Sequence, residues 1–365
     1  MMEEQRDDIA TPGENRRRAY ALLETLEAVR AEALQGDPPE AINTIEALTA
    51  GSAEMEPAAR VAQAAEIIGD LEAEWLEGYL ERRSRAPSLS IIIPHTSTWN
   101  QCTRACLDSI LNAGATSYEI ILVDNGSEDE TLEEVAKLQG AINPEDPDLA
   151  PTLRLLPLGE NRGFAVASNR GAEMAIGRHI CFLNSDTIVS DSWDHDLITA
   201  LSRRGPEGQK IAAVGPMSNY TKEAQLDPEA RYDTAKGFLE HVIRRRERFQ
   251  DRLSFVRFLS GFCLCVNPEA WEKIGHFEES FGLGYYEDDE WSERALDSGY
   301  LLAVTLGTYI HHEGQITVRA LGLDYGEMIR ENRRRIMQMN RDKRPNSGAS
   351  DSEEAARRSS PPSTE

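Results

Sequence analysis

The chain of 365 residues is long enough to bury a large core, and its formal charge of −24 comes from 63 Asp and Glu against 39 Lys and Arg. So acidic a surface repels nucleic acid and anionic lipid, which excludes nucleic acid as the expected partner. Only six of the 39 basic residues are Lys. An acidic, Lys-poor surface suits a high-salt cytoplasm, and it can equally reflect genome composition.

The five Cys stand in apolar stretches with CxxxC and CxC spacing, not in the paired CxxC units of a zinc site. The N-terminus is acidic and lacks the apolar core of a secretory signal, and no apolar run approaches the roughly 20 residues of a membrane span. We therefore expect buried, reduced Cys in a cytoplasmic protein with no transmembrane segment. Peripheral association at the inner membrane face stays open.

Three zones follow one another along the chain. Residues 1–86 are rich in Ala, Glu, Leu and Arg at helical spacing, which predicts a helical N-terminal extension that more often packs or oligomerises than carries a site. We expect it to form a homodimer. Residues 87–340 alternate short apolar runs with helical patterns, and the polar, Pro- and Ser-rich segment 341–365 is typical of a disordered tail.

Within the middle zone, apolar runs predict strands at 89–94, 118–124, 153–158, 179–184 and 211–216, with helix-length stretches at 101–113, 129–139 and 163–177. This alternation predicts an α/β fold with a parallel sheet covered by helices on both faces. Two of the strands end in a carboxylate, Asp124 and Asp186. Because ligands of open α/β sheets bind beyond the carboxyl ends of the strands, both residues are expected at a ligand site.

The segments that follow these strands offer polar groups for a ligand. Asp124 is the first residue of "DNGS". This segment is typical of an ordinary turn, but the carboxylate of Asp124 could also accept hydrogen bonds from the N–H of a base or the hydroxyls of a ribose. The stretch 159–177 has no dinucleotide or P-loop signature. Its Asn161, Arg162 and Asn169 open and line a helix, whose start offers backbone N–H groups to a polar ligand.

Asn184-Ser185-Asp186 places two side-chain oxygens on one side of an extended segment, because side chains alternate between faces. An Asp oxygen is a hard ligand for Mg²⁺ or Mn²⁺, and a diphosphate would supply further oxygens. N-x-D by itself is common in loops.

Four consecutive acids, 287–290, stand at a predicted helix start, where a solvated first turn is the ordinary interpretation. "FGLGYY" and Trp291 bracket them, and aromatic neighbours suit a pocket wall, in which a carboxylate has a raised pKa and can act as a general base. The adjacent His311 and His312 follow a strand-like segment and are candidate metal ligands.

Taken in order, these pieces resemble the family 2 nucleotide-sugar glycosyltransferases of the GT-A fold, in a rhamnosyltransferase-like branch. The resemblance covers about 89–320 and is carried by "LSIIIP", "EIILVDNGSEDET", "ENRGFAVASNRGAEMAIGRHICFLNSDT", "FLSGFCLCVNPEAWEKIGHFEESF", "YYEDDEWSERALDSGY" and "HHEGQIT". It implies an enzyme of polysaccharide or glycoconjugate biosynthesis that uses a nucleotide-diphosphate sugar donor and a saccharide or lipid-linked acceptor.

The resemblance also implies roles for single residues. Asp124 would hold the nucleotide base, and the segment after the first strand would line the nucleoside. Asp186 and His312 would hold a divalent cation under the diphosphate, and Asp288, paired with Glu287, would deprotonate the acceptor during an inverting displacement. The donor set is completed by Pro94, Thr96, Asn161, Arg162, Asn169, Asn184 and Ser185, and the acceptor side by Gly261 and Trp291.

Departures from the family pattern keep some assignments open. Asn184 replaces the first Asp of the D-x-D motif, and "EDDE" leaves the base open among Glu287, Asp288 and Asp289. The Q-x-x-R-W motif and membrane spans of processive synthases are lacking, which indicates transfer of a single sugar. A nucleotidyltransferase would need a Gly-rich, Lys-bearing loop where "PHTSTWNQ" stands. A non-catalytic relative acting through residues 1–86 is the other alternative.

Overall fold

The computed structural model describes residues 86–114, 116–142 and 152–343, together with the single positions 11, 13 and 17. The chain divides into two compact units, Met1–Ala86 and Pro87–Glu365. The expected helices and homodimer surface of 1–86 lie outside the described residues, as does the expected tail from 344 onward. Helix α12 (Tyr325–Lys343) extends three residues into the segment expected to be disordered.

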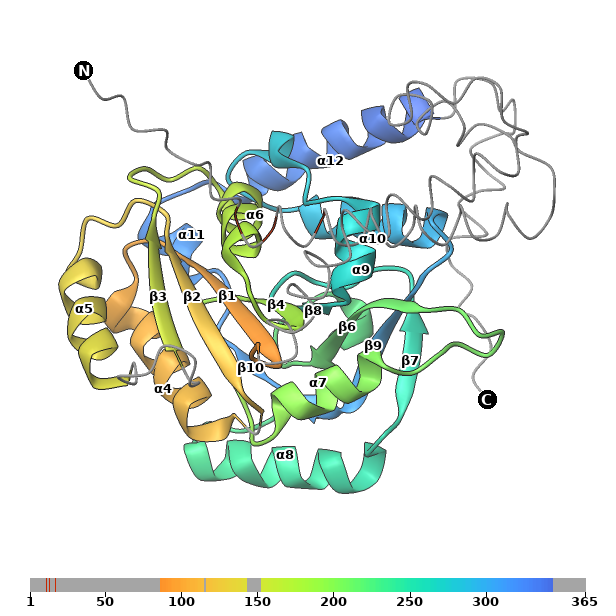
Figure 1. The fold of residues 1–365 in the computed structure, drawn as a ribbon, viewed down its shortest axis with the longest axis horizontal. Helices are drawn as coiled ribbons and strands as arrows, with labels where there is room; N and C mark the ends of the chain where they lie inside the picture. Colours follow the sequence, from red (N-terminus) through yellow and green to blue (C-terminus); the bar gives the residue numbers. More distant parts are fainter. Residues whose placement is uncertain are drawn as a thin grey trace, which may run out of the picture. The chain divides into compact units, whose positions relative to one another are not determined.

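Within the described residues, eight strands form one sheet in the order β3-β2-β1-β4-β8-β6-β9-β7 (Figure 1). Every strand expected from the sequence is present, with each end within one residue of its expected position. The bounds are β1 (Leu89–His95), β2 (Tyr118–Asp124), β3 (Thr152–Pro157), β4 (His179–Leu183), β6 (Ile211–Met217), β7 (Leu253–Val256), β8 (Cys263–Val266) and β9 (Leu301–Tyr309); β5 (Thr187–Ile188) pairs separately with β10 (His311–His312).

The central sheet is mostly parallel, as the resemblance to the GT-A fold implied, and it contains two antiparallel strands. Strands β1, β2, β3 and β4 run parallel, and so do β6 and β9. Strand β8 is inserted between β4 and β6 and pairs antiparallel with both, and β7 pairs antiparallel with β9. Sequence reasoning missed β7 and β8 because a four-residue apolar run does not distinguish a strand from a buried turn or helix.

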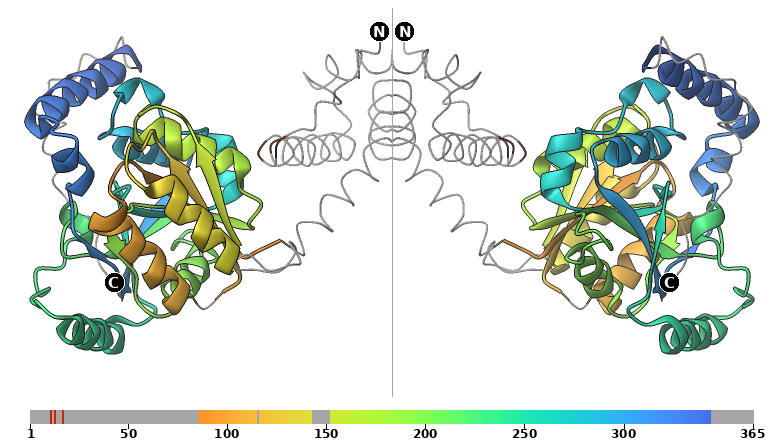
Figure 2. Two further views of the ribbon diagram at one scale, coloured as in Figure 1. Left: turned by 90° about the vertical axis from the view of Figure 1, so that its left-hand side faces the viewer. Right: turned by 90° about the vertical axis from the view of Figure 1, so that its right-hand side faces the viewer.

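Helices cover both faces of the sheet, which confirms the predicted α/β class (Figures 1 and 2). The cause lies in the alternation of buried side chains along each strand: Leu89, Ile91 and Ile93 join one hydrophobic cluster and Ile92 the other. The first cluster includes α4 (Arg104–Ala113), α5 (Thr131–Ile142) and α7 (Trp193–Leu201); the second includes α6 (Phe164–Met174), α8 (Ala235–Phe249), α9 (Pro268–Ile274) and α10 (Glu287–Asp297). Among the described helices none is long and apolar enough to cross a bilayer.

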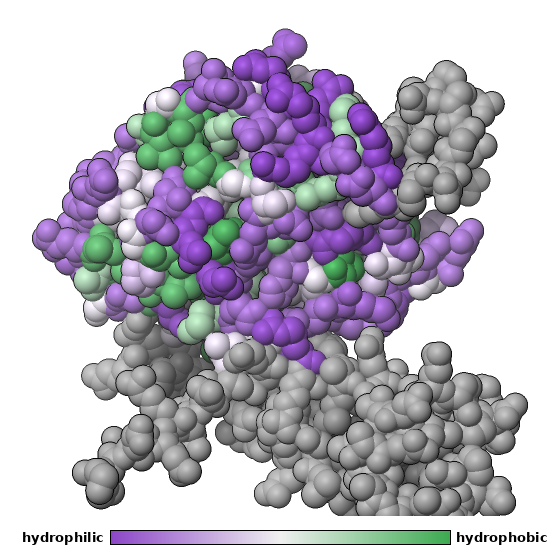
Figure 3. Space-filling view, turned by 90° about the horizontal axis from the view of Figure 1, so that it is seen from above, coloured by the Kyte–Doolittle hydropathy of each residue, from purple (hydrophilic) through white to green (hydrophobic). Residues whose placement is uncertain are grey.

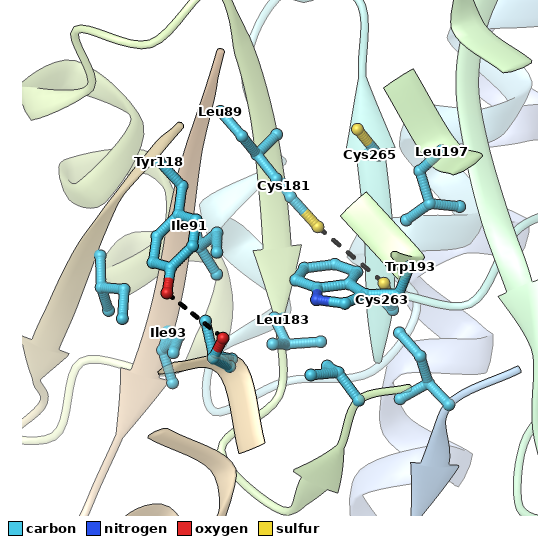
Figure 4. Packing of buried hydrophobic residues seen from close by; sticks show 14 of the residues in the cluster. Leu89, Ile91, Ile93, Tyr118, Cys181, Leu183, Trp193, Leu197, Cys263 and Cys265 are labelled. Carbon is cyan, nitrogen blue, oxygen red and sulfur yellow. Dashed lines mark hydrogen bonds between the residues drawn. The ribbon is translucent and has the colours of Figure 1, made fainter. Parts of the chain in front are cut away.

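The first cluster contains the sulfur atoms of the central strands (Figure 4). Cys181 and Cys263 lie with their Sγ atoms 3.9 Å apart, beyond the ~2 Å of a disulfide, and Trp193 belongs to the same cluster. All five Cys are free and buried, as expected from their apolar surroundings. Burial raises the pKa of the Cys181 and Cys265 thiols, so these side chains behave as small apolar groups.

The strand order reverses at β1, which has β2 on one side and β4 on the other. Its pairing with β2 continues to His95 opposite Asp124, whereas its pairing with β4 stops at Ile92 opposite Phe182. The ends of β1 and β4 therefore separate beyond this point. A crevice at such a reversal is where open α/β sheets bind ligands, so the topology positions the site that the strand-end residues predicted.

We predict that Gly163→Ala lowers the free energy of unfolding by about 3 kcal/mol. Gly163, at the start of α6, has φ 88° and ψ 168°, a backbone region that is essentially restricted to Gly, and an added Cβ would lie 2.0 Å from the carbonyl oxygen of Gly282. Urea unfolding measures the loss. Gly140→Ala is the matched control, because this Gly is exposed on α5 with open space around it. The substitution should raise the free energy of unfolding by about 0.5–1 kcal/mol. Equal effects in the two variants would contradict the prediction.

Candidate active site

A cavity of about 380 Å³ opens where the ends of β1 and β4 separate. Its walls come from segments far apart in the sequence: the two strand ends, the loop after β6, the start of α10, β10 and the helices that follow. This cavity brings together most of the residues predicted from the sequence, namely Pro94, Thr96, Asn161, Asn184, Ser185, Asp186, Gly261, Glu287, Asp288 and His312.

Asp124 and Arg162 are not among the lining residues, but each adjoins one in the sequence. Asp124 ends β2 and accepts a hydrogen bond at Oδ1 from the backbone N–H of Ser127, 3.1 Å away, so it closes the turn. Asn125, which the sequence reasoning did not single out, lines the cavity. Its Oδ1 accepts from the backbone N–H of Arg162 at 2.8 Å, and its amide donates to Asn161 at 3.0 Å. The "DNG" turn thereby fixes the polar loop before α6.

Asn169 and Trp291 were expected at the donor and acceptor sides, and neither side chain lines the cavity. Asn169 is 2% exposed and bonds both backbone groups of Phe277, with Oδ1 accepting from the N–H and the amide donating to the carbonyl. Trp291 is fully buried against Trp271 and donates its indole N–H to the carbonyl of Gly275 at 2.8 Å. The structure thus places both in the packing beneath the site.

His95 is a lining residue whose ring is held on both nitrogens by hydroxyl groups. Nε2 lies 2.7 Å from Thr131 Oγ1, and Nδ1 lies 2.7 Å from Thr103 Oγ1. Burial lowers the pKa of His95 to about 4, against the opposing charges of Asp129 and Asp124. The imidazole is therefore neutral near pH 7 and anchors the end of β1 without adding a positive charge.

Asp186 and His312 form the polar centre of the cavity, with Asp186 Oδ1 3.1 Å from His312 Nε2. His312 Nδ1 lies 2.8 Å from the carbonyl oxygen of Tyr220, and because a carbonyl only accepts, Nδ1 carries a proton. A neutral ring would then present the lone pair of Nε2 to a carboxylate oxygen, an arrangement that is stable only with a proton or a cation between the two atoms. Burial raises the pKa of Asp186, but the hydrogen bond and charge of His312 outweigh it, so the pKa is lowered and the carboxylate is ionised.

The donor set around this pair fits a cation shared with a substrate. In the described part of the chain, no group of three or more His, Cys, Asp or Glu is arranged to hold a metal ion without help. Mg²⁺ and similar ions, however, are commonly bound by one or two carboxylates together with phosphate oxygens and water. Asp186 and His312 therefore suit a cation that arrives with a diphosphate, and Asn184 Nδ2, 3.3 Å from His312 Nε2, lies on the same wall.

Three acids at the start of α10 face the cavity, and their surroundings differ. Asp288 Oδ2 accepts from the backbone N–H of Gly261 at 2.9 Å, and Lys222 Nζ lies 3.2 Å from both Asp288 oxygens and 2.8 Å from Asp289. Glu287 is buried, and its Oε2 has no hydrogen-bond partner among the described residues. Asp288 is thus the acid that is both oriented and compensated by a positive charge.

The pKa values separate the acids further. Burial and the charge of Asp288 raise the pKa of Glu287 to about 8, so this acid is largely protonated at neutral pH. The same two causes raise the pKa of Asp289 to about 6. Burial disfavours the charged form of Lys222, but Asp288 and Asp289 reverse this and raise its pKa, so the ammonium stays charged. Sequence reasoning overlooked Lys222 because its contacts join segments 66 residues apart.

The loop that delivers these acids is held in an unusual conformation. Tyr285 and Tyr286 have φ of 76° and 79°, directly after Gly284 at 148°, and bulky residues rarely adopt positive φ. The buried amide of Asn332 on α12 donates to the carbonyls of Phe281 and Gly284 at 2.8 Å and of Tyr285 at 3.1 Å. One side chain from the last helix therefore stabilises the strained turn that precedes Glu287.

We predict that Glu287→Gln flattens the fall in stability between pH 6 and pH 8. An acid whose pKa is raised by folding stabilises the fold below its unfolded pKa of about 4.5, and this contribution is lost as the pH rises toward the folded value of about 8. Asp289 loses its own contribution by about pH 6, which leaves the upper window to Glu287. Urea unfolding at pH steps from 5 to 8.5 measures the slope.

Glu293→Gln, on the same helix, controls for the removal of one carboxylate from α10. A Glu287→Gln slope equal to that of the wild type between pH 6 and pH 8 would show that Glu287 is already ionised there.

Comparison with known proteins places this geometry in a family. The model described as "Glycosyl transferase family 2" matches residues 90–274, just over half of the chain. An N-acetylglucosaminyl-diphospho-decaprenol L-rhamnosyltransferase of Mycobacterium tuberculosis (strain CDC 1551 / Oshkosh) is 27% identical over 235 residues, covering 58% of this chain and 72% of the relative. Glycosyltransferase AglE of Haloferax volcanii is 25% identical over 223 residues, 60% of this chain and 64% of that protein.

Solved structures give more distant matches. The mannosyltransferase PcManGT from Pyrobaculum calidifontis, in complex with GDP-Man and Mn2+, has a TM-score of 0.44 and 18% identity, with 66% of each chain covered. GalNAc-T7 with UDP, GalNAc and Mn2+ has a TM-score of 0.45 and 15% identity, with 62% of this chain and 44% of that chain covered. On the strength of the family model, this chain belongs to glycosyl transferase family 2 and is a nucleotide-sugar-dependent glycosyltransferase.

Proposed function

We propose that this enzyme moves a single sugar from a nucleoside diphosphate donor to the hydroxyl of a saccharide or lipid-linked acceptor, with a divalent cation and inversion at the anomeric carbon. One observation carries the proposal: the Asp186–His312 pair and the oriented carboxylate of Asp288 line the same cavity at the reversal of strand order. A cation centre and a general base are the two groups that direct displacement of a diphosphate requires.

The donor occupies the side of the cavity formed by the strand ends. Pro94 and Thr96 line the nucleoside, and the "DNG" turn at Asp124 and Asn125 provides backbone and side-chain groups for the base and ribose. The diphosphate lies toward Asp186 and His312, on the wall that also carries Asn184. When bound, Mg²⁺ or Mn²⁺ at Asp186 and His312 neutralises the charge that develops on the departing diphosphate.

Asp288 acts on the other side of the reacting carbon. Its carboxylate takes the proton of the acceptor hydroxyl, the freed oxygen forms a bond to the anomeric carbon, and the bond from that carbon to the diphosphate breaks with both electrons leaving on the nucleoside diphosphate. Base and leaving group then stand on opposite faces of the sugar, which inverts the configuration. The backbone N–H of Gly261 orients the carboxylate, and the ammonium group of Lys222 lies 3.2 Å from both of its oxygens.

We predict that one nucleotide of a panel of UDP, GDP and dTDP binds in calorimetric titration and that Mn²⁺ or Mg²⁺ strengthens its binding. Asp186→Asn should weaken cation-dependent binding at least about tenfold and change binding in EDTA little, because it removes the charged ligand. Asp191→Asn is the matched control, an exposed carboxylate close in the sequence. Equal nucleotide affinities of the wild type and Asp186→Asn in the presence of the cation would contradict cation binding at Asp186. The absence of nucleotide binding by the wild type would overturn the proposed function.

We predict that Asp288→Asn lowers turnover of the matching sugar nucleotide by about 10²–10⁴-fold, since a general base contributes on that order, while donor affinity stays within about twofold. Glu287→Gln should cost at least tenfold less, because Glu287 is protonated near pH 7 and Gln preserves its shape. Steady-state rates at pH 7 with calorimetric donor affinities provide the comparison. If Glu287→Gln is the more damaging change, the base is Glu287. Pyrophosphate release from a nucleoside triphosphate would instead indicate a nucleotidyltransferase.

A further inference from the structure

The cavity has a second wall, which begins beside Asp186, where the backbone of Ile316 hydrogen-bonds that carboxylate, and whose remaining side chains have no role in the transfer chemistry. It is formed by α11 (Ile316–Ala320), the turn after it and the first turns of α12, facing the loop before α10. No residue of α11 is fully buried, although the helix is rich in apolar side chains. The aliphatic lining residues are Leu283, Ile316, Val318, Leu321, Leu323, Met328 and Ile329.

Aliphatic side chains dominate this wall, on which Thr317 and Tyr325 carry the hydroxyl groups, so it offers a nucleotide or a free sugar few hydrogen-bond partners. Both ligands need several hydrogen-bond partners, and a polar group placed against aliphatic side chains without partners loses free energy. Half-buried aliphatic groups gain instead from apolar contact, in proportion to the area removed from water. Moreover, α12 lies beyond residue 274, where the family model ends, and beyond residue 320, where the resemblance in sequence ends.

The occupant of the wall must belong to the acceptor. The donor is proposed to fill the strand-end side, and the acceptor hydroxyl has to approach Asp288, which shares the cavity with the aliphatic residues. Whatever rests on α11 and α12 is therefore attached to the molecule that brings the hydroxyl. We propose that the wall of α11 and α12 binds an aliphatic hydrocarbon chain of a lipid-linked acceptor, an inference that rests on the proposed function.

A long chain also suits the way the cavity opens. A volume of about 380 Å³ cannot enclose a sugar nucleotide together with a whole lipid, so the chain has to leave along the surface. Leu283 and Tyr325, which line the rim, are 41% and 39% exposed. Figure 3, seen from the side on which α12 lies in Figure 1, shows apolar patches set between hydrophilic surfaces. The open cavity holds the first part of the chain and lets the remainder continue outward past these exposed rim residues.

The test measures binding of alkyl β-glucosides of increasing chain length, all below their critical micelle concentrations, to the full-length protein in the presence of the matching nucleotide and Mn²⁺. Affinity should rise by up to about fourfold per methylene from methyl to octyl, because each buried methylene contributes about 0.8 kcal/mol. Met328→Ser should weaken octyl glucoside binding about fivefold and leave methyl glucoside and nucleotide binding unchanged.

Met337→Ser is the matched control, since it makes the same substitution on the same helix at a side chain that is 45% exposed and outside the cavity lining. Equal losses in the two Met variants, or affinity independent of chain length while nucleotide still binds, would overturn the inference and leave the proposed function standing. Phenyl glucoside binding tighter than octyl glucoside would replace the alkyl chain by an aromatic group and also overturn it. A wild-type protein that binds no nucleotide would instead point to failure of the proposed function.

Discussion

The active site depends on holding several carboxylates of like charge in one partly dry cavity. Asp288 and Asp289 share the single ammonium group of Lys222, and Glu287 avoids part of the repulsion by keeping its proton. All three stand in the first turn of α10, where the helix dipole favours negative charge. The backbone N–H of Asp289 donates to Asp288 at 2.9 Å, so the helix start and the ammonium of Lys222 together compensate this carboxylate.

Two elements, α6 and α12, hold the loop that precedes α10. Gly163 allows α6 to approach the backbone of Gly282 more closely than any side chain would permit. Asn332 on α12 captures three carbonyls of the same loop, and the positive φ of Tyr285 and Tyr286 persists because these contacts over-determine the turn. The donor-side helix and the last helix are therefore coupled to the geometry of the base.

The sequence predicted the central strands well because their burial on both faces leaves near-continuous apolar runs. Asn184 and Asp186, which follow one of these strands, line the cavity, where the carboxyl-end rule expects a ligand. The sequence could not place Trp291, since an aromatic residue beside a run of acids looks the same in sequence whether it faces the pocket or the core. Lys222 was not predicted, because its contacts are with residues distant in the chain and no local sequence pattern indicates them.

The two halves of the reaction come from different stretches of the chain. The strand ends that suit the donor lie within residues 90–274, the part that matches the family, whereas Asp288, His312 and the apolar wall come from the stretch that follows. His312 is the link between them, because β10 pairs with β5 directly after Asp186 and brings its ring against that carboxylate. A change in α11 or α12 can therefore alter the apolar wall while the pairing of β5 with β10 keeps Asp186 and His312 in contact.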